Sequence, residues 1–124
     1  MPGGIETADP LFFVASRGHH ADVGGLTPGS MPAFSRTIAD EGLLLRHETF
    51  LSAAGLDVQH WRRRFERGPH PVRNPDQLLA DLRAQLAANQ LGVERLQDLI
   101  AAEGLTRIQA AMQQVQQQAA EAVR

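Results

Sequence analysis

The sequence contains no cysteine and no lysine, because all twelve of its Lys and Arg positions are arginines. The absence of cysteine excludes disulfides, thiolate nucleophiles and cysteine-based zinc sites. It is compatible with a reducing cytoplasm, where we expect the protein to reside. The absence of lysine excludes the Gly-Lys-Ser/Thr signature of a nucleotide-binding P-loop. We therefore expect no ATP-binding loop in this chain.

Long apolar runs and a large excess of one charge are also missing. The longest apolar run, Leu11–Ala15, is far shorter than the about 20 residues that cross a bilayer. Met1–Asp9 lacks the basic and apolar regions of a signal peptide. The net charge is −2 with neutral histidines, so nothing global favours nucleic acid or an anionic membrane as a partner. We expect neither.

The remaining composition predicts one ordinary domain that changes character along its length. Of 124 residues, 43% are hydrophobic and 21% are charged, as in soluble globular proteins. Phe and Trp occur only in the first 65 residues, whereas the last fifty are rich in Ala, Leu and Gln. We predict a flexible lead-in at 1–10 and a partial domain at 11–124, divided into a strand and loop region (11–73) and a helical region (74–124). The predicted fold class is α+β.

The front region contains short elements separated by glycine and proline. Leu11–Ser16 is predicted to be a strand buried on both faces, and Leu43–Phe50 is a candidate second strand. The glycines and prolines of Arg17–Pro32 predict an irregular, shaped loop. Ala54–Leu56 is predicted to be a turn, and Val58–Glu66 a short helix.

The helical region begins with a strong capping signal. Asn74 is a good helix cap, Pro75 suits the first helical position, and Gln77 lies where a capping-box partner would lie. Gly92 is expected to bend or interrupt the helix, and Gly104 to end it. The apolar residues recur at helical spacing on one face: Leu78, Leu79, Leu82, Leu86, Val93, Leu96 and Ile100.

A last helix is predicted after Gly104. Thr106 and Gln109 repeat the capping pattern, and the apolar period continues. The short glycine turn between two amphipathic helices predicts an antiparallel helical hairpin. The apolar residues of the last helix are Ile108, Met112, Val115, Ala119 and Val123.

One dense polar segment, Arg17–Asp22, follows the first predicted strand. Its imidazoles and carboxylate are suitable ligands for a divalent metal, and sites are often built on loops at strand ends. In an extended backbone His20 and Asp22 would point the same way, and His19 the opposite way. The spacing by itself favours a plainer interpretation, in which the two histidines belong to a loop and Asp22 caps it. The metal site is the alternative.

Two further segments allow two interpretations each. Backbone amides of Gly24-Gly25 and of Thr27–Ser30 could approach an anion, but glycine-proline runs are more often simple turns. The basic cluster Trp61–Arg67 could contact nucleic acid. A solvated helix face on which Trp61 and Phe65 pack at i,i+4 is the favoured interpretation.

Taken in order, five segments resemble the hydantoinase B/5-oxoprolinase family. Phe13–Gly25 resembles the family's F-V-A-N-R-A-H-H-A-D-I-G-G, and Thr27–Pro32 matches its T-P-G-S-M-P. Ile38–Leu43 matches I-x-x-E-G-L, Val72–Pro75 resembles V-R-T-P, and Asp81–Asn89 matches D-L-R-A-Q-x-A-A-N. The resemblance runs from about Phe12 to Met112 and is to the C-terminal part of the family's subunit. This sequence departs from the family at a few positions: Ser16, Gly18, Asn74 and the segment Leu45-Arg46-His47.

The resemblance implies a part in the ATP-dependent hydrolytic opening of a lactam or hydantoin ring, of the 5-oxoproline to glutamate type. ATP would act only through a hydantoinase A-type partner. It also implies a divalent metal in the complete subunit, with His19 as the first candidate ligand and His20 and Asp22 as weaker ones. Catalytic residues are not assigned.

Family members are several times longer and carry a further His-x-x-Asp ligand motif upstream. We therefore expect this chain to be a fragment of a larger hydantoinase B-type domain, inactive when isolated. It would associate with the missing N-terminal part, with a hydantoinase A-type subunit or with itself as an oligomer. The alternative is a non-catalytic remnant or a helical interaction module.

Overall fold

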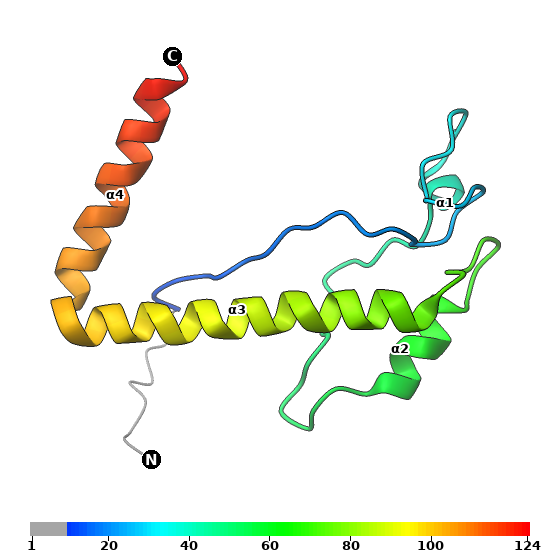
Figure 1. The fold of residues 1–124 in the computed structure, drawn as a ribbon, viewed down its shortest axis with the longest axis horizontal. Coiled ribbons are helices and arrows are strands. Elements are labelled where there is room, and N and C mark those ends of the chain that lie inside the picture. The colour runs from blue at the N-terminus through cyan, green and yellow to red at the C-terminus, as the bar shows by residue number, and fades with distance from the viewer. Residues whose placement is uncertain (1–9) are drawn as a thin grey trace. The chain divides into compact units, whose positions relative to one another are not determined.

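The computed structural model describes residues 10–124, in which four helices and no β-strand are present (Figure 1). The helices are α1 (Ile38–Glu41), α2 (Val58–Phe65), α3 (Pro75–Glu103) and α4 (Leu105–Ala122). The predicted α+β class is therefore corrected to a helical fold for the described residues. Nearly all of the predicted lead-in at 1–10 lies outside them.

The described residues divide into two compact units, and α3 contributes to both. One unit comprises residues 17–86, and the other combines residues up to 16 with residues 87–124. None of the helices within 10–124 is both long and apolar enough to cross a membrane.

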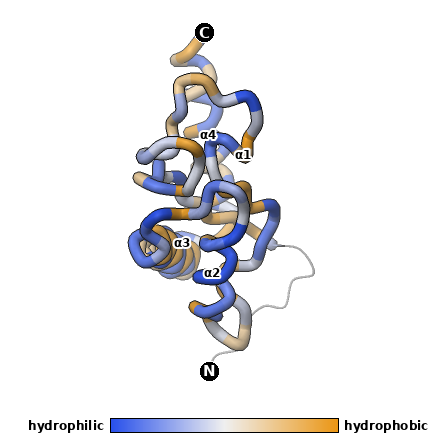
Figure 2. The backbone as a smooth tube through the Cα atoms, turned by 90° about the vertical axis from the view of Figure 1, so that its right-hand side faces the viewer, coloured by the Kyte–Doolittle hydropathy of each residue, from blue (hydrophilic) through white to orange (hydrophobic). Residues whose placement is uncertain are grey.

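The core of the 17–86 unit is built on α2 and the start of α3. Trp61 and Phe65 of α2 are buried with ring centroids 5.8 Å apart, and Phe50 lies 5.2 Å from Trp61. Burying the Phe65 side chain, which has no exposed surface, contributes about 1.5–3 kcal/mol. The α2 trace is mainly hydrophilic (Figure 2), because three consecutive arginines lie between the two aromatic residues. The other buried members of this core are Val72, Leu78 and Leu79.

The predicted second strand, Leu43–Phe50, is irregular. Its backbone bond to the preceding loop is Leu43 N–H to the Val23 carbonyl, at 2.7 Å, and this single bond does not make a ladder. The segment instead supplies Leu43, Leu45 and Phe50 as partly buried side chains to the core. Hydrophobic burial therefore accounts for its apolar pattern.

Two short predicted elements of this unit are confirmed. The turn around Ala54–Leu56 is formed by Ser52 and Gly55, which exchange backbone hydrogen bonds at 3.0 and 3.3 Å. The short helix is α2, where Asp57 caps the first turn by accepting from His60 N–H at 2.8 Å.

The predicted start of the long helix is also confirmed. Asn74 Oδ1 accepts a hydrogen bond from Gln77 N–H at 3.1 Å, and Pro75 occupies the first helical position. The other half of the predicted capping box is absent, since the Gln77 amide bonds to Asp81 at 2.8 Å. The Asn74 N–H donates to Asp22 instead, at 3.0 Å.

Gly92 does not interrupt α3, which continues to Glu103. A Cβ at Gly92 would lie 2.8 Å from Val14 Cγ1, so the missing side chain leaves room for the extended segment beside the helix. The helix ends before Gly104, which adopts a left-handed φ of 83°, as its predicted role as a stop requires.

The strand predicted at Leu11–Ser16 is not formed within the described residues. The segment is extended and irregular, and only alternate side chains are partly buried, namely Phe12 and Val14. Leu11 and Phe13 are 45% and 87% exposed. A strand needs a neighbouring strand, and residues 10–124 provide none.

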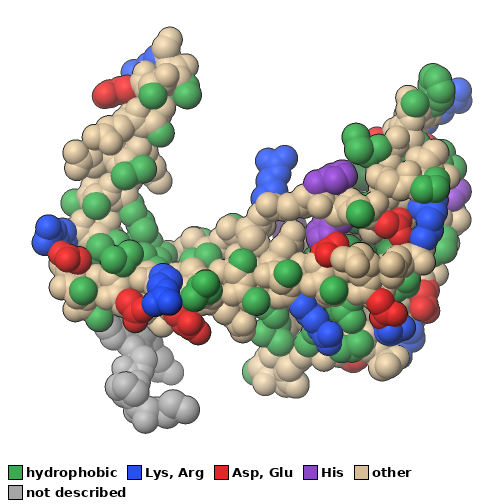
Figure 3. All heavy atoms as spheres, viewed as in Figure 1, with side chains coloured by type: hydrophobic (Ala, Val, Ile, Leu, Met, Phe, Trp, Pro, Cys, Tyr) green, Lys and Arg blue, Asp and Glu red, His purple; other side chains and the backbone are tan. Residues whose placement is uncertain are grey.

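The predicted helical hairpin is also wrong. Beyond its first turn α4 is exposed: Met112, Val115 and Val123 are 38%, 64% and 87% accessible, and hydrophobic side chains are visible along it in Figure 3. Gly104, not Thr106, occupies the N-cap position. The apolar stripe of α4 becomes small toward its end, where alanine and glutamine dominate. It therefore offers little area to hold the helix against α3.

The fit between Gly92 and Val14 yields a testable prediction. Replacing Gly92 with alanine should add about 1 kcal/mol of intrinsic helix stability. It should nevertheless displace Val14, because the new Cβ would lie 2.8 Å from Cγ1. We expect faster chymotrypsin cleavage next to Phe12 and Phe13. In a Val14→Ala background Gly92→Ala should have no further effect on cleavage, and equal acceleration in both backgrounds would show that the two residues are not coupled.

Candidate functional site

The His-His-Asp loop is held between two other backbone segments of the 17–86 unit. Gly25 N–H donates to the His70 carbonyl at 3.1 Å, and Leu26 N–H donates to the Asp40 carbonyl at 2.8 Å. On the same stretch, the Val23 carbonyl accepts from Leu43 N–H. Because these bonds reach both neighbours, the loop is fixed without being part of a sheet.

Glycines make this close approach geometrically feasible. A Cβ at Gly24 would lie 2.3 Å from the His70 carbonyl oxygen, and one at Gly25 would lie 2.6 Å from the Glu41 carbonyl oxygen. Both glycines also have left-handed φ angles, 85° and 89°, which other residues adopt only at a cost. The Gly-Gly pair is therefore a structural requirement of the loop.

The Thr27–Ser30 segment closes the loop as a turn. Ser30 N–H donates to the Thr27 carbonyl at 3.1 Å. The Ser30 hydroxyl donates to the Gly24 carbonyl at 2.6 Å and accepts from Val23 N–H at 2.8 Å. Since the amides of Gly24, Gly25 and Ser30 already have acceptors within the protein, the geometry favours the turn interpretation over an anion site.

Asp22 connects the loop to the beginning of α3. Its Oδ2 accepts from Arg73 N–H at 2.6 Å and from Asn74 N–H at 3.0 Å. Its Oδ1 accepts from Gly24 N–H at 3.0 Å and from the Arg73 guanidinium at 3.3 Å. The same guanidinium donates to the Gly25 carbonyl at 2.7 Å. The carboxylate of Asp22 therefore accepts four hydrogen bonds.

The ionised form of Asp22 is the favoured form. Burial by itself would raise the pKa of this carboxyl group. The hydrogen bonds from Gly24, Asn74 and Arg73 outweigh burial and leave the pKa below its ordinary value, since each donor stabilises the charged form.

The two histidines have different surroundings. The His20 side chain is 18% exposed, with Nδ1 3.7 Å from Asp81 Oδ2 and Nε2 3.4 Å from the Gln85 amide nitrogen. His19 is exposed. His20 thus faces α3, and Asp22 faces the residues just before this helix, in agreement with the extended-backbone argument that both point the same way.

Two arginines of the basic cluster on α2 make ion pairs within the protein. Arg62 pairs with Asp76, and Arg64 pairs with Glu48 at 2.9 Å. Trp61 and Phe65 are buried, so their faces are not free to stack on bases. The interpretation as a helix face with two packed aromatic residues is confirmed.

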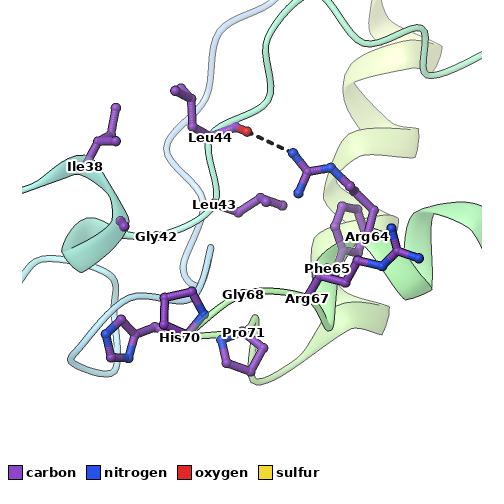
Figure 4. A pocket seen from close by; sticks show the side chains of 12 residues that line it. Ile38, Gly42, Leu43, Leu44, Arg64, Phe65, Arg67, Gly68, His70 and Pro71 are labelled. Atoms are coloured by element: carbon purple, nitrogen blue, oxygen red, sulfur yellow. Dashed lines mark hydrogen bonds between the residues drawn. The ribbon is translucent and has the colours of Figure 1, made fainter.

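The same unit contains a pocket that the sequence does not reveal. It has a volume of about 280 Å³ and lies between α1 and the 64–71 segment, with Leu43 and Phe65 among its apolar lining residues. Arg64 is turned toward the Leu44 carbonyl, to which it donates at 3.1 Å (Figure 4). Its charge is thus already engaged by Glu48 and by this carbonyl.

Comparison with known proteins decides the family. The sequence model of hydantoinase B/oxoprolinase matches residues 2–124. The chain belongs to the hydantoinase B/oxoprolinase family. It is 43% identical to 5-oxoprolinase of Dictyostelium discoideum and 42% identical to 5-oxoprolinase 1 of Arabidopsis thaliana, over 92% of this chain in each case. A 5-oxoprolinase of Saccharomyces cerevisiae is 31% identical over 99% of it.

These relatives are much longer than this hydantoinase B-type chain, which spans 9% or 10% of their length. No solved structure matches it. The resemblance inferred from the sequence motifs is confirmed at the level of the family.

The three candidate metal ligands of this hydantoinase B-type loop do not converge. Asp22 uses both oxygens for four donors, and His20 faces Asp81 and Gln85. In the described part of the chain no three His, Asp or Glu side chains are grouped so as to hold a metal. The side chains of His19, His20 and Asp22 therefore do not form a metal site by themselves. Assignment of His19 as a ligand stays a prediction.

The Gly-Gly pair allows a matched test of the close approach. Gly25→Ala should destabilise the fold by about 2–4 kcal/mol, which combines backbone strain with a clash. Gly29 has a similar φ of 83°, but nothing lies within 4 Å of its added Cβ. Gly29→Ala should therefore cost only about 1 kcal/mol. The measurement is urea unfolding of both variants, and equal losses would refute the packing argument.

Asp22 gives a second prediction from this site. Asp22→Asn removes the charge and replaces an acceptor with a donor, which should lower the free energy of unfolding by about 2–3 kcal/mol. The control is Asp98→Asn, since Asp98 is 71% exposed in a pair with Arg95. That change should cost less than about 0.5 kcal/mol. Similar midpoints in denaturant would argue against the anchoring role of Asp22.

Proposed function

We propose that this chain forms part of a hydantoinase B/5-oxoprolinase-type subunit that takes part in the ATP-dependent hydrolytic opening of a lactam or hydantoin ring. In this proposal ATP is used through a hydantoinase A-type partner. The observation that carries it is the similarity to proteins named 5-oxoprolinase, at 42–43% identity over 92% of the chain. That coverage includes the whole His-His-Asp loop.

The geometry supports different roles for the residues of this loop. Asp22 and the Gly-Gly pair fix the backbone, and His20 lies against α3. His19 remains exposed on the fixed backbone. We therefore propose His19 as the residue that contacts a divalent metal in the complete subunit, with His20 as a positioning residue. Imidazole is a suitable ligand, but a single one rarely holds a metal that prefers four or more.

The second candidate function is a helical interaction module without catalytic activity. Its specific support is α4, which leaves Met112, Val115 and Val123 exposed. Exposed apolar surface of this kind marks interaction sites when it is contiguous. This function would require the surface of α4 and not the chemistry of the loop.

A segment exchange separates the two functions. The matching segment of the Dictyostelium 5-oxoprolinase is replaced with this chain, and ADP release coupled to opening of 5-oxoproline is measured. The control is the same exchange with the matching segment of the Arabidopsis protein, which is a relative at similar identity. We expect both grafted proteins to fold and to open the ring, and the isolated chain to be inactive.

The result that contradicts the proposal is a folded but inactive graft beside an active Arabidopsis control, which favours the interaction module. Within an active graft, His19→Gln should reduce bound Mn²⁺ measured by calorimetry, whereas His60→Gln should not. His60 is an exposed histidine on α2. Equal metal binding in both variants would remove His19 from the ligand set.

A further inference from the structure

The segment Leu11–Ala15 has an extended backbone with unused hydrogen-bonding groups. Within the described residues, no backbone–backbone hydrogen bond joins it to another part of the chain. Leu11, Phe13 and Ala15 are exposed, so water can satisfy these backbone groups in the free chain. A partner strand could replace that water with its own backbone donors and acceptors.

Its side chains alternate in the way that a strand requires. Phe12 and Val14 are partly buried on the side of α3, where Val14 reaches Gly92. They line a pocket with Val93, Leu96 and Ile100 of that helix. Phe13, on the other side, is 87% exposed. One face is thus already covered by a helix, as in a sheet with a helical layer.

We propose that Leu11–Ala15 adds as a strand to an exposed sheet edge in the remainder of a hydantoinase B-type subunit. The identity of this partner rests on the proposed function. In the curated relatives, polypeptide outside the matched segment makes up most of the chain. Strand addition supplies main-chain hydrogen bonds for affinity and side-chain pockets for specificity, and Phe13 is the side chain that such a pocket would receive.

The chemistry of the segment selects a sheet edge over other partners. A helix has already paired its backbone groups internally and would leave those of Leu11–Ala15 unused. A second copy of this chain would supply only one strand, and an isolated two-stranded ribbon is marginally stable in water. The edge of an existing sheet offers free backbone donors and acceptors, and it adds the segment to a sheet of more than two strands. Aromatic and β-branched residues, as in Phe12-Phe13-Val14, also favour strands.

Hydrogen–deuterium exchange tests the proposal in the same grafted Dictyostelium protein and in the isolated chain. In the isolated chain at low concentration, the amides of residues 12–15 should exchange at the rate of an unstructured peptide. In the folded graft, alternate amides should slow by about a hundredfold or more, as in a strand paired along one edge. Slowing of all of them would indicate insertion between two strands and would also support strand addition.

Two results would overturn the proposal. Unslowed exchange at residues 12–15 in a folded graft would show that no strand is added. Slowing in the isolated chain that grows with protein concentration would assign the partner to a second copy. Ring opening is measured on the same samples, so the two proposals can fail separately. A protected but inactive graft contradicts the proposed function alone, and an active but unprotected graft contradicts strand addition alone.

Discussion

The carboxylate of Asp22 is the interaction on which the candidate site depends. It joins a loop to the start of α3 across 51 and 52 residues of sequence. The Arg73 and Asn74 amides lie just before the helix, where backbone donors have no partner within the helix itself. A negative charge at this end is also favoured by the helix dipole. One side chain thus completes the helix terminus and fixes the loop.

Close backbone packing provides the second constraint on the loop. Gly24 and Gly25 allow the backbone to come within hydrogen-bonding distance of two other segments. The Ser30 hydroxyl closes the turn through hydrogen bonds with Val23 and Gly24. The result is a rigid loop made of irregular backbone, held by hydrogen bonds that a sheet would otherwise provide. A rigid support of this kind is what a functional side chain on a loop needs.

The polar residues of this loop therefore have separate roles. Asp22 is an anchor, His20 lies partly buried beside Asp81, and His19 faces solvent. A motif that looks like one ligand cluster in the sequence is distributed over different surroundings in the structure. In our proposal the chemistry that this segment contributes depends on His19, and the other residues of the motif hold the backbone that carries it. The remaining ligands would then come from other parts of a complete subunit.

Local signals in the sequence predicted the elements that depend on local interactions. Asn74 and Pro75 mark the start of α3, Gly104 marks its end, and the glycine-rich loop is irregular as expected. The strand predicted at Leu11–Ser16 is not formed within the described residues, because strand formation depends on a neighbouring strand that they lack. The hairpin failed for a similar reason, since the periodicity of α4 identifies an apolar face and does not identify what covers it.

The site shows the same limit. The spacing of His20 and Asp22 indicated that they face one way, and they contact α3 and the residues just before it, respectively. The four donors of Asp22 could not be inferred, because Arg73 and Asn74 are distant in sequence. Gly92 was expected to disturb the helix, whereas it accommodates Val14. In each of these cases the missing information is a tertiary contact.

The most direct test of the central claim is an NMR titration of the Asp22 carboxyl carbon together with the amides of Gly24, Arg73 and Asn74. The account predicts a pKa below the ordinary value of 3.8, with all three amides shifting along the same curve. The stability that Asp22 contributes would then be present above pH 3.8 and lost as the pH falls through the lower, folded-state pKa. A pKa for Asp22 at or above its ordinary value, with the Arg73 and Asn74 amides unaffected, would contradict the claim that this carboxylate holds the loop to α3.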